Sequence, residues 1–177
     1  MPHLPASAPG RDQATTASPE PTRPAIQQLA WRVFAPIDLA INVVINGGIA
    51  WWLFAARPAV PLTGPAGLTA MVLPMTLILA TVTTFCGFFN AVRERRSGRA
   101  TPPLSRSAPW ALRAVAEAVA TGLGAWLVAT ALALGLAAAA PAATLGPVAA
   151  VLAITMIAGL LGFLLHGRAV SRGGRLH

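Results

Sequence analysis

The chain has very few charged residues for its length. Of its 177 residues, 10% are Asp, Glu, Lys or Arg, whereas 55% are hydrophobic. A soluble domain carries about a quarter of its residues as charged side chains, so the composition excludes an ordinary water-soluble domain. The hydrophobic residues gather in four long blocks instead of alternating with polar residues, which is the pattern of transmembrane helices.

Cysteine is almost absent, and lysine and tyrosine are missing altogether. The one cysteine, Cys86, excludes an internal disulfide, and the sequence predicts a small buried apolar residue at this position. No set of His, Cys and carboxylate residues has the spacing of metal ligands. No Gly-rich loop follows a strand and no nucleophile–base pair is suggested, so we expect neither an enzyme nor a cofactor.

The four apolar blocks predict an all-α membrane protein. A transmembrane helix needs about 20 predominantly apolar residues, and each block is long enough. The expected spans are residues 36–56, 68–92, 110–139 and 148–166. Ahead of the first span, residues 27–35 could form a short interfacial turn of helix that carries a tryptophan and an arginine.

The two ends of the chain and its middle loop differ from the spans. Residues 1–26 are mostly Pro, Ala, Ser and Thr with scattered charges, a composition that predicts a disordered N-terminal tail. The remaining residues, 27–177, would form a single four-helix transmembrane domain. That domain includes a basic loop at 93–109 and a basic C-terminal tail at 167–177.

Arginine accounts for the positive charge, and the formal net charge is +8. Most arginines precede the first span or lie in the middle loop and the C-terminal tail, while the other two loops hold only Arg57. This alternation is the positive-inside pattern. The bias toward Ala, Arg, Pro and Gly is typical of a GC-rich bacterial genome. We therefore expect a multi-pass protein of a bacterial inner membrane with both termini in the cytoplasm.

The basic segments have a bearing on partners. The lipid bilayer is the first, and arginine-rich cytoplasmic loops should attract its anionic lipids. A nucleic-acid partner is not expected, because the basic segments lack the aromatic residues on which bases stack.

Two polar trios lie inside the predicted spans. Within each trio the residues are four apart, which places them on one face of a helix, and a polar face inside a membrane helix is costly enough to need a reason. The first trio is Asp38, Asn42 and Asn46, and the second is Arg113, Glu117 and Thr121. Each member of the second trio lies 75 positions after its counterpart in the first.

The same offset recurs outside the trios. Gly47 matches Gly122, and Gly87 matches Gly162. Because two helices return the chain to the same side of the membrane, the halves would be two parallel two-helix repeats related by an axis along the membrane normal. The alternative is chance alignment of Ala- and Gly-rich helices. A true duplication predicts that the first and third helices pack alike and bring their polar faces together near the axis.

The ionisable members of the trios have two interpretations each. Glu117 lies about 10 Å into the third span, where a lone carboxylate costs at least a few kcal/mol. It could exchange protons or hold a cation, or it could form a structural pair with Arg113 within one helix turn. Asp38 follows Pro36 in the first helical turn, where it could cap the helix or pair with Arg113 across the axis.

The remaining polar residues are also open to two interpretations. Asn42 and Asn46 lie too deep for capping, so they either hydrogen-bond to a neighbouring helix or line a hydrated path. His166 ends the fourth span and could exchange protons at physiological pH, although an interfacial histidine often has no specific role. A hydrated path could extend along the second span through Thr76, Thr83, Thr84 and Asn90.

Together these residues favour a small permease-like protein of the inner membrane that moves a small solute or ion. Its path would lie between the first and third helices and would be lined by the two trios. Because four helices enclose little space, we expect such a protein to act as a homodimer. The alternative is a non-transporting membrane subunit or scaffold in which the same polar residues lock the helices together.

Overall fold

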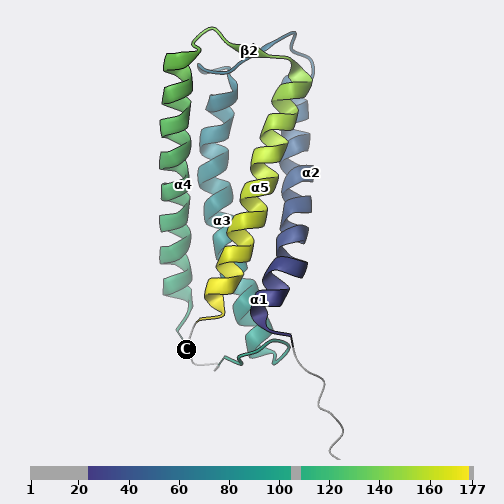
Figure 1. The fold of residues 1–177 in the computed structure, drawn as a ribbon, viewed down its shortest axis with the longest axis vertical. Helices are drawn as coiled ribbons and strands as arrows, with labels where there is room; N and C mark the ends of the chain where they lie inside the picture. Colours follow the sequence, from purple (N-terminus) through teal and green to yellow (C-terminus); the bar gives the residue numbers. More distant parts are fainter. Residues whose placement is uncertain (1–23, 105–108, 176–177) are drawn as a thin grey trace, which may run out of the picture.

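Four long helices run side by side in the computed structural model, which describes residues 24–104 and 109–175. Each of them is long and apolar enough to cross a membrane, which confirms the predicted all-α class and number of spans. Of the tail predicted at residues 1–26, residues 1–23 lie outside the described residues. The helices are α2 (Ala35–Phe54), α3 (Leu68–Arg96), α4 (Ala111–Ala139) and α5 (Pro147–Gly173) (Figure 1).

A short helix leads directly into α2. It comprises α1 (Ile26–Leu29) and the π-helical turn η1 (Ala30–Phe34). Pro36, which follows, accounts for the wide turn, because a proline ring clashes with the carbonyl group four residues earlier in a regular α-helix. In η1 the N–H of Ala35 instead donates to the oxygen of Ala30, five residues back. The predicted interfacial turn is therefore helical, but it is continuous with the first span.

The long helices pack in the order α2, α5, α3, α4. α2 packs on α5, α4 packs on α3, and α3 and α5 pack on each other. In Figure 1, α2 and α4 consequently stand on opposite sides of the bundle. The first span packs on one central helix, α5, and the third span packs on the other, α3. The pattern of contacts is therefore the same for the two halves of the chain. However, the first and third spans do not form a packed pair, so the prediction that their polar faces meet is wrong.

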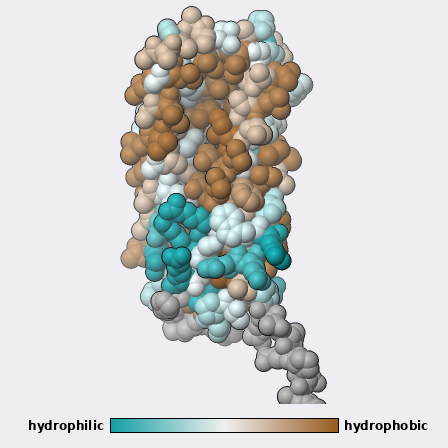
Figure 2. All heavy atoms as spheres, in the orientation of Figure 1, coloured by the Kyte–Doolittle hydropathy of each residue, from teal (hydrophilic) through white to brown (hydrophobic). Residues whose placement is uncertain are grey.

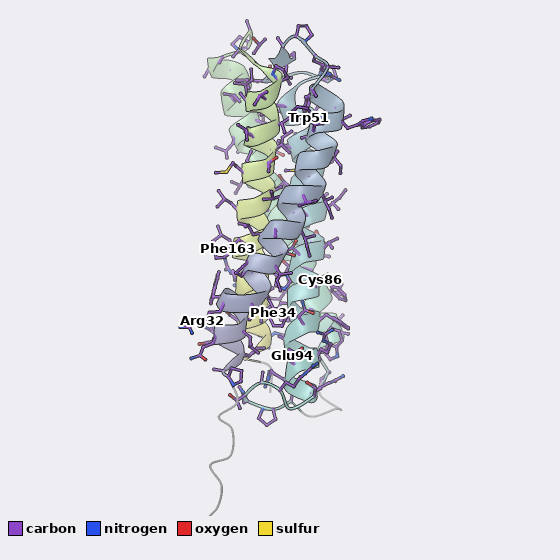
Figure 3. The ribbon with its side chains drawn as sticks, turned by 90° about the vertical axis from the view of Figure 1, so that its right-hand side faces the viewer. Arg32, Phe34, Trp51, Cys86, Glu94 and Phe163 are labelled. Carbon is purple, nitrogen blue, oxygen red and sulfur yellow. The ribbon has the colours of Figure 1, made fainter. Side chains whose placement is uncertain are left out.

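The two ends of the bundle differ in chemistry. At one end, β1 (Val60–Pro61) and β2 (Thr144–Leu145) pair in antiparallel fashion and join the two short loops. The other end, which we call the arginine-rich end, contains α1 and the last turns of α3 and α5. Figure 3 shows Arg32 and Glu94 at this end and Trp51 toward the opposite one.

Two helices extend further than the hydropathy predicted. α3 continues to Arg96 and α5 to Gly173, through the first residues of the expected basic loop and tail. Arginine is a good helix former, and a basic side chain near a helix C-terminus interacts favourably with the helix dipole. The helical backbone therefore continues where the apolar side chains end.

Arg95 connects α3 to α5 and to the following loop at the arginine-rich end. Its guanidinium, 2% exposed, donates from Nε to the oxygen of Pro102 at 2.6 Å and from Nη1 to the oxygen of Gly173 at 2.7 Å. The same loop also holds the start of α1, because the N–H of Ile26 donates to the oxygen of Thr101 at 3.1 Å. Residues 24–26, predicted as part of the tail, are thus tied to the bundle.

Cys86 is a local exception to the predictions. It is exposed on α3, whereas the sequence predicted a buried position. The neighbouring Gly87 and Phe88 are buried, and the helical periodicity turns Cys86 away from the face that they share. In a membrane this side chain would face lipid.

Candidate functional site

The first trio forms a ladder of hydrogen bonds along α2. Asn42 Nδ2 donates to the backbone oxygen of Asp38 at 2.8 Å and to its carboxylate Oδ2 at 2.9 Å. Asn46 Nδ2 in turn donates to the backbone oxygen of Asn42 at 3.1 Å. A Cβ atom on Gly162 of α5 would lie 2.5 Å from Asn42 Nδ2 and 2.8 Å from Asp38 Oδ2. The ladder therefore packs closely on α5, where a glycine makes room for it.

His166 extends this ladder to a third helix. Its Nδ1 lies 3.2 Å from Asp38 Oδ1, and its Nε2 lies 3.2 Å from Asn90 Nδ2 on α3. The contact with Asp38 has the distance of an ion pair but not the alignment of a directed hydrogen bond. The imidazole is 4% exposed and stacks on Phe34 at a centroid distance of 6.1 Å. We call Asp38, Asn42, Asn46, His166 and Asn90 the buried polar chain; Asn42 and His166 are buried and the other three are half-buried.

Both predicted interpretations of Asp38 are wrong. It does not cap a helix, because η1 continues the helix upstream and no capping hydrogen bond is present at the start of α2. It does not pair with Arg113 either, because that residue lies on α4 at the opposite side of the bundle. Its ion-pair partner is His166, which the sequence did not connect to it.

The second trio is divided by the fold. Arg113 is exposed and makes no ion pair with any residue that the structure describes. Glu117 does not pair with Arg113 but accepts a hydrogen bond from Nη1 of Arg172 on α5. This partner was missed because α5 was expected to end at His166, six residues before it. Thr121 lies one turn beyond Glu117 on the same face of α4.

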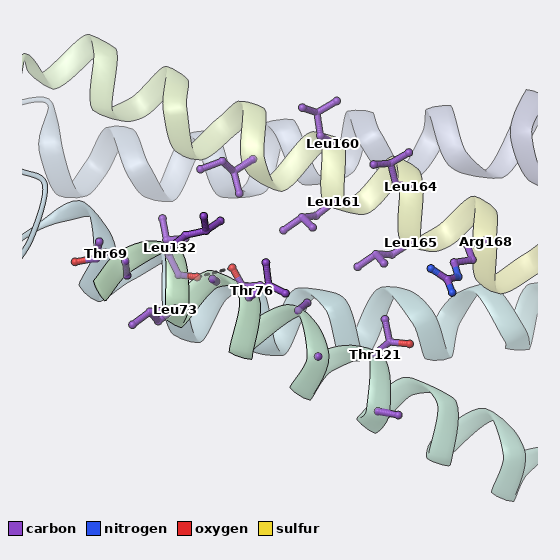
Figure 4. A pocket seen from close by; sticks show the side chains of 18 of the residues that line it. Thr69, Leu73, Thr76, Thr121, Leu132, Leu160, Leu161, Leu164, Leu165 and Arg168 are labelled. Carbon is purple, nitrogen blue, oxygen red and sulfur yellow. Dashed lines mark hydrogen bonds between the residues drawn. The ribbon is translucent and has the colours of Figure 1, made fainter. Parts of the chain in front are cut away.

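Glu117 and Thr121 line a lateral groove of about 790 Å³. α3 forms its floor between Leu68 and Thr76, and α4 and α5 form its walls (Figure 4). The α4 wall runs from Glu117 to Leu136, a rise of about 28 Å in an α-helix, which is close to the thickness of the hydrocarbon core of a bilayer. The groove therefore follows most of the predicted membrane thickness.

Apolar side chains form most of the lateral groove. On the α5 wall they are Leu160, Leu161, Leu164 and Leu165. Polar groups are few: three threonines occur along the groove, and the ion pair with one further arginine lies at the arginine-rich end. These polar residues are Thr69, Thr76, Thr121, Glu117, Arg168 and Arg172. An apolar space of this size with a few polar groups is typical of ligand sites, and this one suits an amphipathic molecule.

Of the other residues predicted for a path, three lie outside the lateral groove and one lines it. Thr83 and Thr84 are buried among the packed helices, and Asn90 belongs to the buried polar chain. Thr76 does line the lateral groove, although its hydroxyl donates to the backbone oxygen of Val72 at 2.7 Å (Figure 4). The spacing of Glu117, Thr121 and the later groove residue Gly124 places them on one helix face. That spacing was the signal in the sequence that could have identified the α4 wall of the groove.

Comparison with protein-family models, curated proteins and solved structures found no match. Among the described residues, no group of three or more His, Cys, Asp or Glu could hold a metal ion. The lateral groove and the buried polar chain are the two candidate functional features.

Proposed function

We propose that the protein is a small permease-like membrane protein and that the lateral groove receives the solute that it moves. The observation that carries this proposal is the Glu117 carboxylate at the arginine-rich end of a groove of about 790 Å³ between α3, α4 and α5. An ionisable residue within a membrane helix is costly and often marks a substrate or ion pathway. The sequence predicted a path between the first and third spans, which are α2 and α4. The path proposed from the groove lies between α3, α4 and α5 instead.

The lining indicates the class of solute. The leucines of α5 favour an apolar body, and the charged groups at the arginine-rich end favour a polar group on the same molecule. Because Arg172 pairs with Glu117, a polar group of the solute could exchange with one member of the ion pair. A small amphipathic solute fits both parts of the groove.

The remaining parts of the proposal follow from the distribution of charge and from the shape of the groove. The alternation of arginine-rich and arginine-poor loops supports a bacterial inner membrane with the arginine-rich end in the cytoplasm. The lateral groove opens to one side of the bundle, so a second copy of the chain could close it. We therefore include a homodimer in the proposal.

A second candidate function is a non-transporting subunit or scaffold. The buried polar chain favours it, because these five residues contact one another and connect α2, α5 and α3. The Asn42 and Asn46 hydrogen bonds lie within α2, whereas His166 joins α2 to α3 through its contacts with Asp38 and Asn90, and such contacts between helices are an ordinary structural role of polar residues in a membrane. In this alternative the lateral groove would hold lipid or a partner helix.

A deletion strain tests the first candidate. Growth is screened over metals, toxic compounds and nutrients, and the strain is complemented with the wild type, Glu117→Gln or Arg113→Gln. Transport predicts that the wild type and Arg113→Gln restore growth, whereas Glu117→Gln does not, because only Glu117 lies in the lateral groove. All three proteins should reach the same level in the membrane.

The stability of Glu117→Gln separates the two candidates. Its ion pair with Arg172 is partly exposed, so loss of the pair should cost less than about 1 kcal/mol. If Glu117→Gln unfolds more readily and loses function in proportion, the carboxylate is structural and the transport role falls. Full complementation by Glu117→Gln would also reject that role.

A further inference from the structure

A second hollow of about 790 Å³ lies beside the lateral groove at the arginine-rich end. It is lined by Gln27 and Trp31 from the N-terminal helical segment, by α5 between Leu164 and Arg172, and by Arg175, which follows α5; we call it the basic hollow. We propose that the basic hollow, which shares Arg168 and Arg172 with the lateral groove, binds the headgroup of one anionic phospholipid.

The charge of the basic hollow favours an anion. Arg168, Arg172 and Arg175 all line it. Arg172 is paired with Glu117, whereas Arg168 and Arg175 make no ion pair with any other residue in the described part of the chain. Two guanidinium groups are thus left over, one on α5 and one just past its end. Guanidinium binds phosphate oxygens through paired N–H donors, so a phosphodiester is a suitable ligand.

Trp31 gives the hollow a fixed aromatic wall. Its ring packs on Phe163 at a centroid distance of 5.7 Å. A Cβ atom on Gly167 would lie 2.5 Å from the same ring, so the glycine allows the indole to lie against α5. Tryptophan is enriched at the headgroup level of membranes. The hollow is therefore placed at the depth where a phospholipid carries its phosphate.

The order of residues along α5 distinguishes a lipid from a free anion. Arg175 follows the end of α5, Arg172 lies in its last turn, Arg168 lies one turn further into the bundle, and the exposed Leu164 and Leu160 come next. Figure 2 shows the same order on this face, with hydrophilic atoms toward the arginine-rich end and apolar atoms beyond them. A phospholipid has its phosphate and acyl chains in that order, and a soluble phosphate would make no use of the leucines.

Native mass spectrometry of the purified full chain tests the proposal with phosphatidylglycerol and phosphatidylcholine as probes. We expect the wild type to retain one phosphatidylglycerol in preference to phosphatidylcholine. The variant Arg168→Gln/Arg175→Gln should bind phosphatidylglycerol on the order of tenfold more weakly, because it loses both unpaired guanidinium groups. The matched control is Arg93→Gln/Arg113→Gln, which removes the same charge from exposed positions on α3 and α4 and should bind as the wild type does.

Three outcomes would overturn the proposal. Equal weakening in the control would show diffuse attraction of the whole arginine-rich end. Equal binding of phosphatidylcholine would show that the phosphate charge is not recognised. Displacement of phosphatidylglycerol by excess inorganic phosphate would assign the hollow to a soluble anion. Thermal unfolding of each variant confirms that it is folded, which the exposed positions of Arg168 and Arg175 lead us to expect.

Discussion

Gly162 sets how closely α5 approaches the polar face of α2. The nearest atoms to a Cβ at this position belong to Asn42 and Asp38, so a single methyl group would push apart the ladder and the helix that carries His166. The buried polar chain thus depends on a residue that has no side chain.

We predict that Gly162→Ala destabilises the protein by about 1–3 kcal/mol, the usual cost of overpacking. The matched control is Gly48→Ala on α2, where an added Cβ has no neighbour within 4 Å. It should be neutral or stabilising by up to about 1 kcal/mol, since alanine favours a helix more than glycine does. Unfolding in a detergent or bicelle titration measures both. Equal stability of the two variants would contradict the close packing of α5 on the ladder.

Spacing along one helix was predictable at the residue scale, and contacts between helices were not. The interval of four residues placed Asp38, Asn42 and Asn46 on one face, and the structure joins them by hydrogen bonds along that face. His166 is far from them in sequence, and nothing in the local pattern connects it to Asp38. Such a contact depends on the order of the helices.

At the scale of elements, Arg95 connects the end of α3 with the end of α5 and with the loop that follows α3. Its guanidinium binds backbone oxygens of Gly173 and Pro102. These bonds provide partners for carbonyl groups that a helix end and a proline-rich loop otherwise leave without donors. The extended ends of the two central helices are thereby held together.

We predict that Arg95→Met destabilises the protein by about 2–3 kcal/mol, because charge-assisted hydrogen bonds to buried carbonyl groups are lost. Arg93→Met is the control: Arg93 has a side-chain exposure of 56%, and its loss should cost less than about 1 kcal/mol. Thermal unfolding and the rate of tryptic cleavage after Arg99 provide the measurements. Similar values for both variants would reject the role of Arg95 as a fastening residue.

The sequence predicted the positions of the helices better than their ends. Hydropathy located all four spans, because long apolar blocks are what the bilayer requires. It ended the second span at residue 92 and the fourth at residue 166, whereas the helices continue to Arg96 and Gly173. Hydropathy follows side chains, and the hydrogen bonding of the backbone continues beyond the last apolar residue.

At the scale of the whole molecule, the order of the helices determines which polar residues meet. Membrane helices are apolar on most sides, so their sequences do not select one packing face, and small residues allow several pairings. The sequence therefore could not show that α4 packs on α3 while α2 packs on α5. That order places the first trio in the buried polar chain. It places Glu117 and Thr121 of the second trio in the lateral groove, outside which Arg113 lies. The duplication of 75 residues stays a prediction.

The central claim is that the lateral groove carries the solute, and Gly124 allows it to be tested directly. Gly124 lines the groove, and an added Cβ there has no neighbour within 4 Å, so Gly124→Leu adds a bulky apolar side chain to the groove at an open position. Gly135 also has no neighbour within 4 Å of an added Cβ but does not line the groove, which makes Gly135→Leu the control. Both variants should be at least as stable as the wild type, since leucine favours a helix more than glycine does.

The decisive measurement is uptake, into proteoliposomes, of the solute that the growth screen identifies, with the two variants compared side by side. The account predicts that Gly124→Leu loses most of the uptake while Gly135→Leu retains it. Equal uptake by the two folded variants would contradict the claim that the solute passes through the lateral groove.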